Sequence, residues 1–413
     1  MPVIITHPTG NVFFRAAARG FYDAGILHSI YTSVASFPGT IPYSLGAINI
    51  FSDIRRRAME NTFRHLTHTH PWKETGRLVA TKLHRQKMVQ HETGKFSTDA
   101  VYKSLDNHVS KKIGKEKAKG ASAVYAYEDG ALQTFTRSKD VGLECLYDLP
   151  IGYWRVMHDM LAAEKELNPE WAVTLGGLKD SAAKLNRKDE EISLADKIFV
   201  AGSFTLKTLK TYPGKLPQVF VVPYGFPEAK AKQYRSFAAS QKLKILFVGG
   251  LSQRKGLSYM FKAMEGLEDH IALTIVGRME NYDCKPLVQN LRKHTWIETL
   301  SNDKVLDLMQ ENDLLLFPSL FEGFGQVITE AMAQGTPVIT TERTAGIDLI
   351  EHGENGWLAE AGSAEAIQNI LHELISTPRL ISQVGTAALE TAKKRPWSVY
   401  GQELAQAVER SRK

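Results

Sequence analysis

Short apolar runs alternate with amphipathic segments along most of the chain, and such periodicity is the main sequence signal of secondary structure. In the first half, the runs with the length of strands are residues 2–6, 27–33, 124–128, 143–148, 197–201 and 218–223. In the second half, they are residues 243–250, 271–277, 295–300, 313–319, 336–341 and 355–359, and a segment of helix length follows nearly every one. This alternation predicts an α/β fold with parallel sheets covered by helices on both faces.

The two halves of this pattern are separated by a polar, lysine-rich stretch. Pro223 and Pro227 stand at its start, and the sequence EAKAKQYRSFAASQK follows. Such a break predicts a domain junction near residues 224–242. We therefore expect two doubly wound, Rossmann-like domains, the first over residues 1–224 and the second over residues 243–395.

Residues 51–120 differ from the rest of the first half, because they are basic, rich in histidine and poor in strand patterns. Sixteen Lys and Arg stand against six Asp and Glu between residues 54 and 119, whereas the remainder of the chain has a net charge of −4. We interpret the segment as a helical insertion. Its charge fits a solvated face, a surface that docks on anionic lipid headgroups to reach a lipid-linked acceptor, or nucleic-acid binding. Because few aromatic residues are interleaved and no nucleic-acid module is recognised, we expect no nucleic-acid partner.

Composition excludes several classes of protein. With 413 residues, of which 43% are hydrophobic and 23% charged, the chain is long enough for two globular domains. Cys145 and Cys284 are the two cysteines, which excludes a disulfide scaffold and suits a reducing compartment. We recognise neither a signal peptide nor an apolar run of membrane-spanning length. We expect a cytoplasmic protein, with any membrane contact peripheral and at the inner face.

The segment 318–341, PSLFEGFGQVITEAMAQGTPVITT, carries the strongest chemical signal. A strand leads into a loop with Glu322 and Gly325, and a helix begins near Gly325 and Gln326. Ligands of open α/β sheets bind at the carboxyl ends of strands, and a helix N-terminus offers N–H groups to a phosphate. Glu330, one turn further along, could accept hydrogen bonds from two adjacent hydroxyls. The motif therefore predicts a ligand that carries both phosphates and polyols.

A second motif, LKILFVGGLSQRKG, supports the first. A strand runs through Gly249 and Gly250 to Arg254 and Lys255, and a helix follows. Two adjacent cations at the carboxyl edge of a sheet would neutralise a diphosphate and stabilise it as a leaving group. The spacing differs from the G-x-x-x-x-G-K-[ST] loop of ATPases, which disfavours that type of ATP hydrolysis.

These two segments, with TAGIDLIEHGENGWL after them, resemble the retaining glycosyltransferases of family 4, which have the GT-B fold of two domains facing each other across a cleft. The family signature is a pair of Glu separated by seven residues, matched here by Glu322 and Glu330. The resemblance is close over about 243–395 and extends to the first half in layout only. It implies that residues 1–224 bind the acceptor and residues 243–395 the nucleotide-sugar donor. It also implies that a last helix, 396–413, returns to the first domain.

The resemblance further implies roles for single residues. Glu330 would hold the ribose hydroxyls and Glu322, a candidate catalytic residue, would contact the donor sugar. The backbone N–H groups of Gly325, Gln326 and Val327 would bind the distal phosphate, and Lys255 would bind the diphosphate.

Some positions depart from the family pattern or define it less sharply. Many relatives carry Arg where Gly250 stands, and we propose Arg254 as its substitute. A loop at Thr344–Gly346 would close over the phosphates, with Gly346 at its end. The base would lie near residues 297–303.

The first half departs from the family more strongly. Thr9, Gly10 and Asn11 occupy the place of a Gly-rich loop after the first strand, and we expect Gly10 and Asn11 to face the donor. Where relatives often have a His facing the reacting carbon, this chain has three other candidate catalytic residues, namely Tyr127, Glu128 and Asp129. Asp148, at the end of the next predicted strand, is a further candidate.

The reaction implied is front-face transfer of a sugar with retention, to a glycan or lipid-linked acceptor. The departing phosphate would itself take the proton of the acceptor hydroxyl. No metal and no cofactor besides the nucleotide-sugar substrate is expected, because the helix end and the Arg–Lys pair would take the place of Mg²⁺. Two alternatives remain: a nucleotide-sugar epimerase of the same fold, and a non-enzymatic binding protein that acts through the basic segment 54–119.

Overall fold

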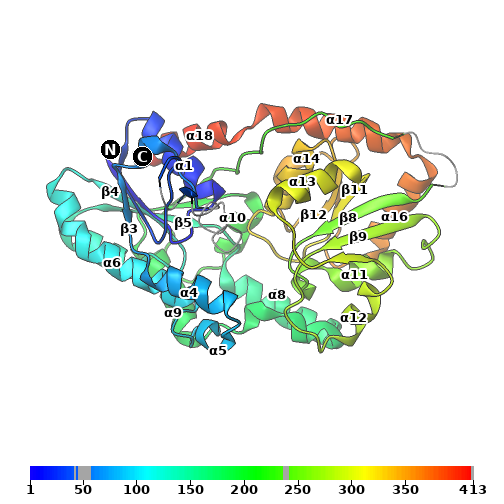
Figure 1. The fold of residues 1–413 in the computed structure, drawn as a ribbon, viewed down its shortest axis with the longest axis horizontal. Coiled ribbons are helices and arrows are strands. Elements are labelled where there is room, and N and C mark those ends of the chain that lie inside the picture. The colour runs from blue at the N-terminus through cyan, green and yellow to red at the C-terminus, as the bar shows by residue number, and fades with distance from the viewer. Residues whose placement is uncertain (41–42, 45–56, 236–240, 411–413) are drawn as a thin grey trace.

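A computed structural model describes residues 1–40, 43–44, 57–235 and 241–410 of the chain. It contains two parallel sheets, one in each half, and each is covered by helices on both faces (Figure 1). This architecture confirms the α/β class of two doubly wound domains that the sequence pattern predicts. The domain limits remain a prediction. Residues 51–56, 236–240 and 411–413, which belong to the expected insertion, junction and last helix, lie outside the described residues.

The first sheet has the order β3-β2-β1-β4-β5-β6-β7, and all of its neighbouring strands are parallel. Its strands are β1 (Val3–Thr6), β2 (Leu27–Thr32), β3 (Thr67–Thr69), β4 (Ala123–Tyr127), β5 (Glu144–Leu149), β6 (Lys197–Val200) and β7 (Gln218–Val221). The central strands are apolar and wholly buried, because helices cover both faces of a parallel sheet.

The second sheet has the order β10-β9-β8-β11-β12-β13 and is again parallel throughout. Its strands are β8 (Leu243–Val248), β9 (Ile271–Val276), β10 (Thr295–Ile297), β11 (Leu314–Phe317), β12 (Val338–Thr341) and β13 (Trp357–Ala359). In both sheets the strand order reverses direction beside the first strand, between β1 and β4 and between β8 and β11. Loops at the carboxyl ends of these strand pairs are where open α/β sheets bind ligands.

Helices connect the strands. In the first half they are α1 (Val12–Asp23), α4 (Trp72–Lys82), α5 (Gln86–Val89), α6 (Thr98–Ala118), α7 (Leu132–Val141), α8 (Trp154–Leu167), α9 (Ala182–Leu194) and α10 (Ser203–Leu209). In the second half they are α11 (Leu257–Ala263), α12 (Lys285–Leu291), α13 (Asn302–Glu311), α14 (Gln326–Ala333), α15 (Gly346–Leu349), α16 (Ala364–Ser376), α17 (Arg379–Lys394) and α18 (Trp397–Glu409). Short 3-10 turns are η2 (Asn61–Phe63), η3 (Pro169–Thr174), η4 (Gly176–Leu178) and η5 (Gln253–Lys255).

The basic segment contains one strand that the sequence pattern did not predict. Thr67–Thr69 forms β3, which pairs with β2 at the edge of the first sheet. Its three residues are partly or fully exposed, so the strand lacks the apolar alternation that reveals buried strands. The helices α4, α5 and α6 follow it and lie along the outside of the first domain (Figure 1).

The carboxyl edges of the two sheets face each other. Thr205, after β6, donates a hydrogen bond of 3.0 Å to the carbonyl of Gly323, after β11. A Cβ on Gly323 would lie 1.8 Å from the Pro150 carbonyl oxygen, so the backbones of the loops after β5 and β11 touch at this point. Asp348 on α15 accepts the N–H of Ser203 at 2.8 Å. Both ligand-binding edges therefore meet at one junction.

The last helices span both domains along one side of the molecule (Figure 1). α17 packs on α14 of the second domain and α18 packs on α1 of the first. The α1–α18 crossing is close because Gly20 faces Gly401, where a Cβ on Gly20 would lie 2.1 Å from the Gly401 carbonyl oxygen. The chain turns between the two helices at Arg395 and Pro396, and the Arg395 guanidinium donates to the Pro223 carbonyl at 2.6 Å. The two connections between the domains therefore lie side by side.

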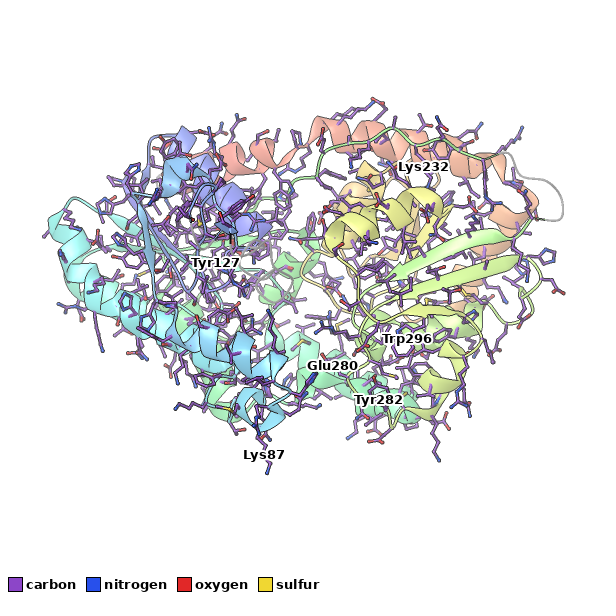
Figure 2. The ribbon with its side chains drawn as sticks, viewed as in Figure 1. Lys87, Tyr127, Lys232, Glu280, Tyr282 and Trp296 are labelled. Carbon is purple, nitrogen blue, oxygen red and sulfur yellow. The ribbon has the colours of Figure 1, made fainter. Side chains whose placement is uncertain are left out.

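The linker after this crossing is tied to the second domain. Lys232, labelled in Figure 2, donates to the carbonyl of Met309 at 2.9 Å and to the Thr336 hydroxyl at 2.7 Å. Tyr234 donates to the Gly335 carbonyl at 2.8 Å. Burial lowers the pKa of Lys232 to about 8.

Within the part of the chain that the structure describes, no helix has both the length and the apolar character needed to cross a bilayer.

Candidate functional site

The candidate site lies at the carboxyl ends of β8 and β11, where the order of the second sheet reverses. Two glycines bring the loop after β8 close to the loops after β11 and β9. A Cβ on Gly256, whose φ is +72°, would lie 2.0 Å from the Pro318 carbonyl oxygen. A Cβ on Gly277 would lie 1.8 Å from the Gly249 carbonyl oxygen. The β8 loop can approach its neighbours this closely only because these positions have no side chain.

Glu322 is the centre of a buried ionic cluster in these loops. Arg254 donates to its Oε1 at 2.8 Å, the Ser319 hydroxyl donates at 2.9 Å, and the Lys255 ammonium also bonds to Oε1. Glu322 is 8% exposed. Among the described residues, every protein hydrogen bond to this carboxylate uses Oε1, which leaves Oε2 for another partner. The structure thus brings together three residues that the two sequence motifs supplied separately.

The charges of this cluster are mutually stabilised. Burial alone would raise the pKa of Glu322, but Lys255 and Arg254 together hold that pKa below its ordinary value. Burial lowers the pKa of Lys255, while Glu322 opposes this shift. Two cations therefore share one carboxylate, and the cluster has a net positive charge that suits a polyanionic ligand.

The N-terminus of α14 lies next to this cluster. The helix begins at Gln326 after Gly325, whose φ of +87° is in the left-handed region. A Cβ on Gly325 would lie 3.0 Å from the Phe317 ring, and the Lys255 ammonium lies 4.7 Å from the centroid of the same ring. The first N–H groups of a helix have no intrahelical partner, so those of Gln326 and Val327 point out of the helix end. Cation and helix end can therefore act on the same anion.

Glu330 lies one turn along α14. Its Oε1 accepts a hydrogen bond of 3.0 Å from the Asn302 side chain at the start of α13. Burial raises the pKa of Glu330, and the hydrogen bond from Asn302 partly offsets this shift. This arrangement leaves carboxylate lone pairs for two donors such as vicinal hydroxyls.

Two further sequence candidates lie around the cluster. Gly250 is exposed, and no heavy atom of the described residues lies within 4 Å of the Cβ it would carry. Arg254, expected to compensate for it, donates to the Phe321 carbonyl at 2.5 Å as well as to Glu322. Gly346 begins α15 and is buried, with its N–H bonded to the Thr344 hydroxyl at 3.0 Å.

In the first domain, the sequence candidates Gly10 and Asn11 lie in the loop after β1. Gly10 has a φ of +58°, and the Asn11 side chain caps α1 by accepting the Phe14 N–H at 3.0 Å. His7 is a residue that sequence reasoning missed, although it directly follows the first strand. It is buried, and its Nδ1 accepts the Thr9 N–H at 3.1 Å. Burial lowers the pKa of His7 to about 3, so this imidazole is neutral at physiological pH.

Tyr127 and Asp148 lie inside the first domain (Figure 2 labels Tyr127). The Tyr127 ring meets His7 edge to face with 4.7 Å between the centroids, and its buried hydroxyl has no partner among the described residues. Asp148 accepts the Tyr125 hydroxyl at 2.5 Å, and burial raises the pKa of Asp148 to about 7. Neither side chain reaches the Glu322 cluster through a described contact.

Glu128 and Asp129 are held by α9. Lys188 lies 3.1 Å from Glu128 and 3.5 Å from Asp129, while Arg187 donates to Asp129 at 2.9 Å. Glu191, also on α9, is buried and accepts the Asp129 N–H at 2.8 Å. These contacts make Glu128 and Asp129 part of an ionic network between α9 and the loop after β4. The structure therefore places the three candidate catalytic residues of the first domain apart from the candidates of the second.

An arm from the first domain binds the cationic loop of the second, a contact that no sequence motif predicts. The arm is residues 154–178, formed by α8, η3 and η4. Gln253, directly before Arg254, is fully buried, and its side chain donates to Glu164 at 2.7 Å. Its N–H donates to the Thr174 hydroxyl at 2.9 Å. Contacts between distant segments thus position the Arg254–Lys255 pair.

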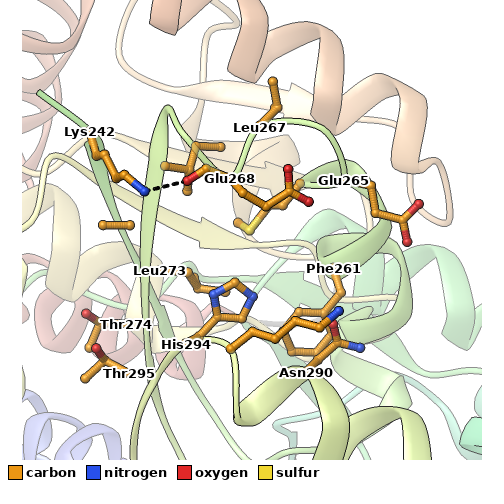
Figure 3. A pocket seen from close by; sticks show the side chains of 14 residues that line it. Lys242, Phe261, Glu265, Leu267, Glu268, Leu273, Thr274, Asn290, His294 and Thr295 are labelled. Atoms are coloured by element: carbon orange, nitrogen blue, oxygen red, sulfur yellow. Dashed lines mark hydrogen bonds between the residues drawn. The ribbon is translucent and has the colours of Figure 1, made fainter. Parts of the chain in front are cut away.

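Two other features lie away from this site. A cavity of about 470 Å³ opens at the amino ends of β8, β9 and β10, the edge opposite the glycine-rich loops, where His294 stacks on Phe261 (Figure 3). Three potential metal ligands, His91, Glu92 and Asp180, lie within 4.8 Å of one another. Protein groups already bind these carboxylates, since Ser181 donates to Glu92 and Lys184 donates to Asp180.

The second half of the chain matches a family of known proteins. Residues 229–391 match the family model described as Glycosyl transferases group 1. Phosphatidyl-myo-inositol mannosyltransferase from Mycobacterium leprae is 29% identical over 171 residues, which cover 40% of this chain and 46% of that protein. GDP-mannose-dependent alpha-mannosyltransferase from Corynebacterium glutamicum is 30% identical over 173 residues, which cover 42% of this chain and 41% of that protein. The chain thus aligns with less than half of the length of these relatives.

Solved structures extend the similarity of the fold to the whole chain. Anabaena HepE in complex with UDP and glucose aligns over 100% of both chains with a TM-score of 0.64 and 17% sequence identity. At this identity the match defines the fold alone. It confirms the GT-B architecture that the sequence motifs imply.

Proposed function

Residues 229–391 belong to the glycosyl transferases of group 1 and the chain has the GT-B fold, and from this premise we propose that the protein is a retaining glycosyltransferase. It moves a sugar from a nucleotide-diphosphate donor to a glycan or lipid-linked acceptor. The observation that carries the proposal is the cluster in which Arg254 and Lys255 share Glu322 beside the N-terminus of α14.

The donor would bind across this cluster. The N–H groups of Gln326 and Val327 and the Lys255 ammonium would hold the two phosphates, since both lie against Phe317. Glu330 would accept the ribose hydroxyls. Glu322 has Oε2 left for a hydroxyl of the donor sugar, because the described contacts use Oε1.

The chemistry follows from these positions. The bond between the anomeric carbon and the diphosphate oxygen breaks, and its electron pair leaves with the nucleoside diphosphate. Lys255 and the helix end stabilise this developing charge, which is the main task of the protein in the reaction. The acceptor hydroxyl attacks the same face of the sugar, and its proton passes to the departing phosphate. No protein base is required, which agrees with the pairing of Glu128 and Asp129 to cations.

The names of similar proteins narrow the first donors and acceptors to test. The Mycobacterium leprae protein is named for phosphatidyl-myo-inositol, which supports a lipid-linked acceptor. The Corynebacterium glutamicum protein is named for GDP-mannose, and the HepE structure contains UDP and glucose. A donor panel should therefore begin with uridine and guanosine diphosphate sugars.

The test is release of free nucleoside diphosphate from such a panel, with and without lipid and oligosaccharide acceptors. We expect acceptor-dependent release with at least one donor, and a product with the anomeric configuration of the donor by NMR. Glu322→Gln should lower turnover by about 10²–10³-fold, while Glu373→Gln, on the exposed face of α16, serves as a matched control. The proposal is refuted if no donor binds or turns over. An isomerised donor without transfer would instead favour an epimerase.

A further inference from the structure

The basic segment shows more positive charge to solvent than its composition suggests. Four of its six carboxylates are buried, namely Glu74, Asp99, Asp106 and Glu116. Glu74 pairs with Arg57 and Arg77, and Glu116 pairs with His28 and Lys119. Lysines such as Lys87, Lys111 and Lys112 are exposed. The exposed charges of the described part of the segment are therefore mostly positive.

An exposed apolar stripe runs along α4 within this cationic surface. Trp72, Val79 and Leu83 are 76%, 51% and 63% exposed. They are seven and four residues apart, so they share one face of the helix. Met88 on α5 is also exposed, at 36%. Large apolar side chains grouped on one face of a soluble domain mark a surface that binds a partner.

A cationic pocket adjoins the stripe. It has a volume of about 440 Å³ and lies between α6 and the start of α4, lined by His70, Lys73, Ala100, Lys103, Ser104, Asn107, His108 and Lys111. None of these eight residues is acidic. His70 stacks on His108 with 4.3 Å between the ring centroids. Burial, and then the charge of Lys111, lowers the pKa of His70, so an anion bound here would favour its protonated form.

The stripe and the pocket are neighbours on the surface of the first domain. Lys73, which lines the pocket, follows Trp72 in the chain, and α4 packs against α6. Lys87 projects from the lower edge of the molecule in Figure 2, the side on which Tyr282 of the second domain also lies. Tyr282 is 64% exposed.

We propose that α4, α5 and the adjoining cationic pocket form a face that docks on a bilayer rich in anionic lipid, with the pocket receiving a phosphate headgroup. A tryptophan and aliphatic side chains surrounded by lysines are the composition of helices that lie in a membrane interface. Each exposed lysine near an anionic leaflet adds electrostatic attraction. Nucleic acid would not require the apolar stripe. The proposal does not rest on the donor site, since none of these residues takes part in it.

Sedimentation of the full chain with vesicles tests the docking. We expect binding to vesicles of phosphatidylcholine with 30% phosphatidylglycerol, weaker binding as salt rises, and little binding to phosphatidylcholine alone. Lys87→Ala with Lys111→Ala should reduce the partition coefficient on the order of tenfold or more. Trp72→Ala with Leu83→Ala should reduce it on the order of tenfold, because the stripe no longer inserts.

Controls separate docking from folding and from transfer. Val221→Ala with Lys394→Ala changes one exposed apolar residue and one exposed lysine elsewhere, and should bind as the parent does. Glu322→Gln should also bind vesicles unchanged. The proposal is overturned if anionic vesicles do not sediment the parent at low salt, or if both double variants bind as the parent does. It is also overturned if a short DNA duplex binds more tightly than the vesicles do.

Discussion

The carboxyl edges of the two sheets can be compared directly, because the strand order reverses beside the first strand in both. In the second domain, glycines at positions 249, 256 and 325 have positive φ values and keep the backbone open to a ligand. In the first domain, the same edge is filled by His7, Tyr127 and the ion pairs of Glu128 and Asp129. One topology therefore carries a glycine-rich, cationic edge in one half and an edge filled by aromatic and ion-paired side chains in the other.

The two edges also differ in what compensates the burial of a carboxylate. Glu322 is buried, yet its pKa stays low because two cations compensate it. Asp148 is buried with a tyrosine hydroxyl as its partner, and burial raises its pKa to about 7. Glu322 is thus held in its ionised form by its neighbours, whereas Asp148 is partly neutralised near physiological pH.

The largest expected effect comes from removing a cation of the donor site. Lys255→Met keeps the length of the side chain but removes the charge that would face the leaving diphosphate. We expect kcat/KM for sugar transfer to fall by about 10²–10³-fold. Lys394→Met, at an exposed position of α17, should leave kcat/KM unchanged. Turnover within threefold of the parent would exclude a role for Lys255 in leaving-group stabilisation.

A second effect concerns the stability of the first domain and its dependence on pH. In the unfolded chain an Asp has a pKa of about 3.9, whereas Asp148 has a raised folded-state pKa of about 7. Between these values the folded chain binds one proton more, so the free energy of unfolding falls as pH rises. From pH 5 to pH 7 this group should remove roughly 2–3 kcal/mol. Asp148→Asn should abolish that part of the slope.

Urea unfolding at several pH values measures this effect. Asp148→Asn should be more stable than the parent at pH 8, and close to it at pH 4. Asp159→Asn, at an exposed position of α8, should follow the pH dependence of the parent. Parallel curves for Asp148→Asn and the parent would contradict the raised pKa.

A third and smaller effect separates the two glutamates of the donor site. Glu330→Ala should weaken binding of the nucleoside diphosphate severalfold while the fold stays intact, since one bidentate acceptor is lost. Because burial raises the pKa of Glu330, affinity should fall on acidification at a higher pH than for an exposed carboxylate. Calorimetric titration across pH 4 to 8 measures both. Unchanged affinity of Glu330→Ala would refute the ribose role.

The smallest effect is expected at Gly250, where the described structure leaves space for a side chain. Gly250→Arg should fold normally and bind nucleoside diphosphate slightly more tightly, by no more than about threefold, because Arg254 and Lys255 already supply charge. Gly176→Arg, at an exposed position with equal space and no left-handed φ, is a matched control. A tenfold gain would show instead that Arg254 does not substitute for the residue that relatives carry at position 250.

Much of the donor half could be predicted from sequence. The alternation of strands and helices defined both sheets, apart from β3, whose edge position left no apolar pattern. The motifs around Arg254, Lys255, Glu322 and Gly325 lie on loops after strands that are neighbours in a parallel sheet, so their convergence followed from topology. The glycines in these motifs also signalled close approach of the backbone.

The first domain was less predictable for a physical reason. Glu128 and Asp129 directly follow β4, as expected, but their partners Lys188 and Arg187 are on α9, some sixty residues later in the chain. No local pattern shows whether a carboxylate meets a lysine or a substrate. His7 carried a weak signal, its position after the first strand, while its burial depends on rings from α1, α6 and β4.

Local order in the chain thus determined the two parallel sheets, the ligand-binding edge of the second and the residue types for a phosphate, because these depend on periodicity and on neighbouring positions. Only the tertiary structure decided that Arg254 and Lys255 share Glu322, and that the arm 154–178 holds their loop through Gln253. It also decided that four carboxylates of the basic segment turn inward and leave its lysines outside. Such pairings join residues that are far apart in the chain. They form only on folding, because a buried charge is stable only when its partner is buried beside it.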